Sequence, residues 1–145
     1  MFNWRNAGQI LLALTMAASV AGCGRQDGVA VYPVRGTVQH AGKPAAGAKV
    51  VLYAIDRQDA NVPFPKGIVQ EDGTFELTSY HDGDGAPVGD YNVTIEWLEP
   101  FPPGVNRESF TPADRLHGVY ASPERSKLKA TITKGENILP PIELN

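Results

Sequence analysis

The chain has little cysteine and no excess of positive charge. Its 145 residues include one cysteine, so no disulfide can form within the chain and the fold depends on core packing. The 13 basic and 16 acidic residues give a net charge of −3, which argues against a nucleic-acid partner. Glycine (15) and proline (12) are abundant for a helical protein but too few for a disordered one. These features predict one turn-rich folded domain.

The N-terminal apolar run is also shorter than the roughly 20 residues that a membrane-spanning helix requires. It covers residues 10–20 and follows a single basic side chain, Arg5, which is the layout of an export signal. Directly after it comes Val20-Ala21-Gly22-Cys23, which resembles the lipobox of bacterial lipoproteins. Small side chains before the cysteine admit an extended backbone to a peptidase cleft, and the Cys23 thiol can carry a diacylglycerol thioether.

This resemblance implies cleavage between Gly22 and Cys23 and acylation of the new amino group. Residues 1–22 are then a signal peptide and residues 23–30 a lipid-anchored tether of at most about 25 Å. Two or more fatty chains hold a protein firmly on a bilayer. We expect a membrane-anchored lipoprotein of the cell envelope, on the periplasmic or outer-surface side. An ordinary signal peptide with an incidental cysteine is the alternative.

From residue 31 onward, hydrophobicity alternates with period two and shows no convincing helical period. Strands are expected over residues 34–39, 48–55, 67–70, 75–78, 90–97 and 127–133, with a proline-bearing edge strand at 138–144. The best alternation places Tyr91, Val93, Ile95 and Trp97 on one core face. Because apolar sheet faces must cover one another, the pattern predicts an all-β, seven-stranded antiparallel Greek-key β-sandwich. A closed barrel is the alternative.

Three glycines are expected to shape these strands. Gly73 follows an aspartate in a tight turn that needs a positive φ, and Phe75 lies on the returning strand as a core residue. Gly36 lies inside a strand, which is typical of a bulge or a close approach. Gly89 lets the chain turn sharply into the strand that carries Tyr91.

Several of these stretches, taken in order, resemble carboxypeptidase regulatory-like domains. They are residues 34–38, 42–44, 47–50, 72–75 and 89–95, with a tail at 120–123 and 135–137 similar to that of small bacterial lipoproteins. The likeness covers residues 31–145 and implies a transthyretin-like (prealbumin-like) sandwich. It also implies a folding, adhesion or binding role rather than catalysis.

The sequence does not present an enzyme's set of residues. The 5-hydroxyisourate hydrolases have transthyretin-like folds, but their Tyr-Arg-Gly-Ser ending is missing from residues 141–145. His40, His81 and His117 fall in turn or loop contexts without metal-ligand spacing. We therefore expect no enzyme, no metal and no cofactor. An envelope enzyme on this fold is a disfavoured alternative.

Two segments remain as candidate sites. Asp82 and Asp84, with Asp90 nearby, are weak calcium candidates, since calcium takes six to eight oxygens but the expected loop spacing is missing. A calcium- or carbohydrate-binding module is therefore an alternative function. Residues 98–126 are too long for an ordinary loop. They either fold over an open end of the sandwich or form a partner-binding edge. The expected function is a non-catalytic binding, adhesion or structural role, with an envelope protein or glycan as partner.

Overall fold

The computed structural model describes residues 28–56 and 63–145, so the expected signal peptide and the lipobox-like residues 20–23 lie outside the described residues. All regular structure in these ranges is β, and they contain no helix that could span a bilayer. The strands are β1 (Val31–Tyr32), β2 (Val34–His40), β3 (Lys43–Pro44), β4 (Lys49–Ala54), β5 (Lys66–Ile68), β6 (Thr74–Glu76), β7 (Ala86–Pro87), β8 (Gly89–Glu96), β9 (Lys129–Ile132), β10 (Asn137–Ile138) and β11 (Ile142–Leu144).

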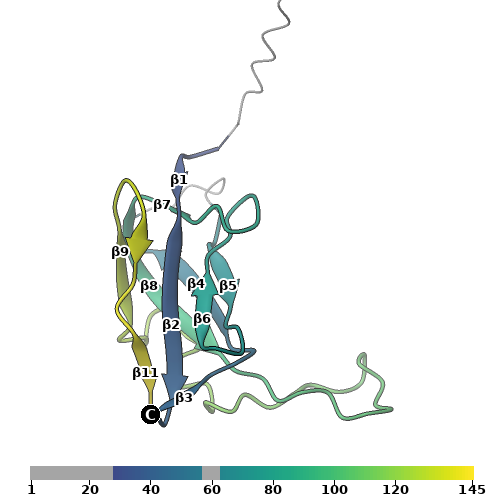
Figure 1. Ribbon diagram of the computed structural model, residues 1–145. Helices are drawn as coiled ribbons and strands as arrows, with labels where there is room; N and C mark the ends of the chain where they lie inside the picture. Colours follow the sequence, from purple (N-terminus) through teal and green to yellow (C-terminus); the bar gives the residue numbers. More distant parts are fainter. Residues whose placement is uncertain (1–27, 57–62) are drawn as a thin grey trace, which may run out of the picture.

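These strands form two main sheets that face each other (Figure 1). One sheet has the order β5-β4-β8-β9, and all its neighbours are antiparallel. The other is built on β2, with β6 and β3 along one side and β10 and β11 along the other. A short β1–β7 pair closes the end where the described chain begins. Neither sheet closes on itself, so the arrangement is sandwich-like and the alternative of a closed barrel does not describe it.

The space between the two sheets is filled by apolar side chains from both. Val34 and Val38 of β2 and Phe75 of β6 meet Tyr91 and Val93 of β8, and each is at most 1% exposed. Ile95 is fully buried, whereas Trp97, at the end of this alternating face, is half-buried and packs against the edge of the core. Period-two alternation therefore places the buried face of β8, because successive side chains of a strand point to opposite sides of the sheet.

The sheet built on β2 is mixed, so the prediction of an entirely antiparallel sandwich is wrong for this sheet. Both β10 and β11 run parallel to β2, with Asn137 opposite Val34 and Ile142 opposite Val38. The preceding strand, β9, belongs to the other sheet, and the turn at residues 133–136 carries the chain across the sandwich. A segment that crosses between sheets can enter beside β2 in either direction, whereas a tight hairpin within one sheet gives only antiparallel neighbours.

At two positions the fold requires a glycine, once for a positive φ and once for close packing. Gly73 has φ +88° in the turn between β5 and β6. A Cβ added to Gly36 would stand 2.6 Å from Cζ of Phe75, so the glycine lets the buried aromatic ring lie directly against the backbone of β2. Gly89 opens β8 with φ 153°.

The two ends of the sandwich carry different parts of the chain (Figure 1). The first described residues lie at the end with β1, where the Val29 N–H donates to the hydroxyl of Tyr80 over 3.1 Å. The opposite end holds β3 and the end of β2, where the rings of His40 and Trp97 form a T-shaped contact with centroids 5.7 Å apart. The seven residues of β2 separate these ends by about 20 Å.

Candidate functional site

The three histidines lie on separate segments. His40 is half-buried at the end of β2, and His117 is exposed in the segment that precedes β9, with φ +52°. His81 is exposed in the loop between β6 and β7. Across the described ranges, no group of three or more histidine, cysteine, aspartate and glutamate side chains is placed to hold a metal ion. Each of the three histidines therefore belongs to a different segment of the described chain.

The acidic loop between β6 and β7 uses its best-placed carboxylate to hold its own backbone. Asp84 accepts the N–H of Ser79 at 2.7 Å through Oδ1, and those of Tyr80 and His81 at 3.0 and 2.9 Å through Oδ2. Burial raises the pKa of this carboxyl, but the three N–H donors lower it, and the pKa lies below its ordinary value. An oxygen pair already engaged by three donors is poorly suited to bind calcium.

The other two calcium candidates do not add to a common site. Asp82 is exposed in the same loop. Asp90 lies on β8, opposite Thr131 of β9, and its Oδ1 accepts the threonine hydroxyl at 2.5 Å. Asp84 therefore holds the backbone of its own loop, and Asp90 binds a side chain of the neighbouring strand β9.

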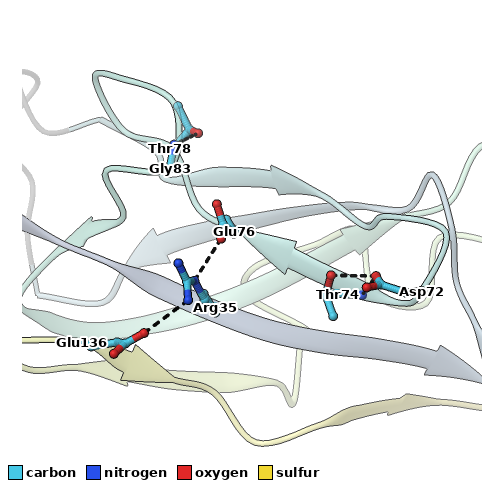
Figure 2. Close-up of polar contacts among 7 residues, drawn as sticks. All are labelled: Arg35, Asp72, Thr74, Glu76, Thr78, Gly83 and Glu136. Carbon is cyan, nitrogen blue, oxygen red and sulfur yellow. Dashed lines mark hydrogen bonds and ion pairs between the residues drawn. The ribbon is translucent and has the colours of Figure 1, made fainter.

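An exposed ion-pair network crosses the outer face of the β2 sheet (Figure 2). Arg35 of β2 stands between two glutamates, with Nε 2.9 Å from Glu76 Oε1 and Nη1 3.4 Å from Glu136 Oε1. The side chains are more than half exposed, so the network contributes little to stability. Figure 2 also shows Asp72, whose Oδ1 accepts both the N–H and the hydroxyl of Thr74 and so fixes the Gly73 turn.

A groove of about 630 Å³ opens beside β5 and β6. Its lining includes Lys49, Lys66, Glu76 and Asp82, all of them exposed. These side chains present solvated charges of both signs rather than a desolvated, preorganised set of the kind that catalysis uses. The groove therefore gives no reason to assign a reaction to it.

Residues 98–126 divide into a projecting part and a packed part. Residues 98–113, hereafter the arm, extend away from the sandwich body (Figure 1). The residues that follow return to the body, where Leu116 is 4% exposed and Tyr120 packs against the core. The covering interpretation therefore describes the returning part of the loop, whereas a role of this loop as a partner-binding edge stays a prediction.

The base of the arm is held by Asp114, which the sequence analysis did not single out. Its Oδ1 accepts the N–H of Trp97 at 3.0 Å and that of Leu116 at 3.1 Å, and its Oδ2 accepts the N–H of Gly118 at 2.9 Å. Burial raises the pKa of Asp114, the N–H donors lower it, and the pKa lies below its ordinary value. In the sequence, this role is indicated only by the position of Asp114 two residues before Leu116, whose N–H it accepts, which is the spacing of an Asx turn.

Aromatic and backbone contacts complete this base. The guanidinium carbon of Arg115 lies 4.8 Å from the centre of the Trp97 ring, whose Nε1–H donates to the carbonyl of Ala46 at 2.8 Å. Backbone hydrogen bonds join Arg115 N to Trp97 O and Glu99 N to Ala113 O, so the two limbs of the arm leave the body as a short ribbon. The arm is therefore fixed where it begins, although its far part is exposed.

Comparisons with known proteins give limited information. No protein-family model and no curated protein matches the chain. Among solved structures, it is similar to a DUF3823 family protein from Parabacteroides merdae, with 15% identity and a TM-score of 0.40. The match covers 81% of this chain and 47% of that one, so the chain spans about half the length of that protein.

Proposed function

We propose that this chain is an exported, lipid-anchored protein of the cell envelope with a non-catalytic binding, adhesion or structural role. The observation that carries the proposal is Cys23, the single cysteine of the chain, at the end of a lipobox that follows a short apolar run. Seven residues, 24–30, separate this cysteine from β1. The anchor would thus hold the body close to a bilayer on its periplasmic or outer-surface side.

The described residues support a binding role over an enzymatic one. Within them the best-engaged carboxylates, Asp84 and Asp114, accept backbone N–H groups of the segments they hold. The histidines stand on separate segments, and the grooved surface beside β5 carries exposed charges. The Asp84 and Asp114 carboxylates thus stabilise loops, as a protein that presents loops to a binding partner requires.

We also propose that the fold is the seven-stranded Greek-key sandwich of transthyretin-like domains. Two observations support this. The strands longer than two residues, with β10 and β11 taken as one edge interrupted by Pro140 and Pro141, number seven. They are distributed as three in the β2 sheet and four in the other, and the chain passes between the sheets repeatedly. An experimental structure of the body with a different strand order would contradict this assignment.

The anchor is tested by expressing the full chain with its own leader in a bacterium and examining the product by mass spectrometry. We expect an N-terminus at residue 23, bearing a diacylglycerol thioether and an acylated amino group, and partition into the detergent phase. The Cys23→Ala variant should leave that phase, whereas the neighbouring Gly24→Ala control should remain in it. An unmodified cysteine or a retained leader would overturn the proposal.

A further inference from the structure

The arm exposes an unusual amount of apolar chain. Every residue from 99 to 109 is exposed, including Phe101 and Val105. The arm also holds four of the twelve prolines of the chain, Pro100, Pro102, Pro103 and Pro112. The hydrophobic core does not include these residues, so packing in the core does not explain why they are apolar.

Covalent geometry restricts the first limb of the arm to an extended form. Pro100, Pro102 and Pro103 have φ fixed near −65° by their rings. Glu99 and Phe101 each precede a proline, which disfavours the helical region and favours the polyproline II region. Each residue from 99 to 103 is therefore either a proline or the residue before one. Proline geometry therefore favours the polyproline II form over residues 99–103. The chain turns directly after this segment, where the Val105 N–H donates to the carbonyl of Pro102 at 3.3 Å and Gly104 has φ +79°.

The polyproline II geometry separates the side chains of this limb by role. With three residues per turn, Pro100 and Pro103 share one ridge and Phe101 lies on another. The ring of Phe101 is engaged within the arm, because its centroid lies 5.9 Å from that of Phe110 and 5.0 Å from the guanidinium carbon of Arg107. This packing fixes the rotation of the limb. The ridge of Pro100 and Pro103 remains exposed.

We propose that the arm is a docking segment whose Pro100–Pro103 ridge binds an aromatic-lined groove on a protein partner. A Pro-x-x-Pro segment in the polyproline II form fits such a groove and loses little conformational entropy on binding. The inference rests on the proposed envelope location and names the binding surface for that role. The arm leaves the sandwich at the end opposite β1, and the proposed tether joins the body at the β1 end (Figure 1). An anchored body would therefore hold the arm on its side away from the membrane, where it would meet a partner protein.

Two other kinds of partner, a lipid surface and a glycan, fit the arm less well. An anionic lipid surface attracts basic segments, but the arm has one basic residue, Arg107, and two acidic residues, Glu99 and Glu108. A glycan would call for exposed rings with polar groups at their edges, whereas Phe101 packs within the arm. A second copy of the chain is a third alternative partner, and the cross-linking experiment below distinguishes it from a different protein.

The test places a photo-crosslinking amino acid at Val105, which flanks the proline segment, in the full chain produced in cells of its source. A matched control places it at Thr131, exposed on β9 of the body. We expect one major protein adduct from Val105 that is absent from Thr131 and is attached at a tryptophan- or tyrosine-lined site of the partner. Adducts to lipid, glycan or a second copy, or equal adducts from both positions, would overturn the proposal.

Proline variants then test the ridge itself against the purified, cross-linked partner. The Pro100→Ala/Pro103→Ala double variant should weaken binding by about tenfold or more, whereas Pro112→Ala on the other limb should change it less than twofold. Equal losses in both variants, or none in the first, would overturn the proposal. Melting temperatures close to that of the parent chain show that a lost interaction is not lost folding.

Fractionation of the parent chain, with the Cys23→Ala form as the unanchored reference, separates this inference from the proposed function. If the parent chain fractionates like the Cys23→Ala form but Val105 still gives the same adduct, the anchor proposal fails and the docking inference stands. If the chain is anchored and Val105 gives no adduct, the docking inference fails and the anchor proposal stands.

Discussion

The sandwich body and the arm are held by different interactions. In the body, side chains from both sheets exclude water from one core, and residues such as Phe75 and Tyr91 are 1% exposed. The arm is held at its base by the Asp114 carboxylate and the Trp97 ring, while Phe101 further along remains 38% exposed. Apolar burial therefore decides whether this chain folds, whereas hydrogen bonds at one end decide where the arm points.

The largest contrast between the two regions should come from removing one phenylalanine from each. Phe75→Ala leaves a cavity in the core and should lower the free energy of unfolding by about 3–5 kcal/mol. Phe101→Ala, the matched change in the arm, should lower it by about 1 kcal/mol or less, because the ring is already partly in water. Urea denaturation measures both. Similar losses in the two variants would show that the arm belongs to the cooperative core.

The base of the arm should respond next most strongly. Asp114→Ala removes the acceptor for three backbone N–H groups and should cost about 1–3 kcal/mol. Amide exchange at Trp97, Leu116 and Gly118 should become faster, while exchange in β4 and β8 stays slow. The exposed Asp82→Ala change is the control and should stay within about 0.5 kcal/mol. Unchanged exchange at the three amides would contradict this role for Asp114.

Acid should weaken both carboxylate-held loops. The folded-state pKa values of Asp84 and Asp114 lie below the ordinary value of 3.8, so the ionised carboxylates favour the folded state. This contribution is fully present above the unfolded-state pKa and is lost as the pH falls through the lower folded-state pKa. The melting temperature should therefore decrease from about pH 5 toward pH 3. The Asp84→Asn/Asp114→Asn variant should show a smaller decrease, and an identical slope would rule out this explanation.

The smallest effect is expected from the exposed ion pairs of the β2 sheet. Arg35→Ala should change the free energy of unfolding by less than about 1 kcal/mol, and 1 M salt should remove most of that difference. Lys134→Ala, in the exposed turn before β10, is a control without a glutamate partner in the described ion pairs. A loss as large as that of Asp114→Ala would mean that this surface network contributes more than solvent screening allows.

Local patterns in the sequence anticipated much of the body. Alternation over residues 90–97 marks the side of β8 that is buried, and the Asp72-Gly73 pair marks the turn before β6. Both features depend on near neighbours in the chain, namely the period-two geometry of a strand and the freedom of glycine to adopt a positive φ. The resemblance of residues 20–23 to a lipobox is equally local, and so is the polyproline II tendency of residues 99–103.

Only the tertiary structure decided the remaining features, because they join residues far apart in the sequence. The parallel entry of β10 and β11 beside β2 depends on how the chain crosses from one sheet to the other. The capture of the Trp97 N–H by Asp114 depends on the return path of the arm. The placement of β1 and the arm at opposite ends depends on the whole strand order. Such pairings are selected by the packing of the complete core, which no local period encodes.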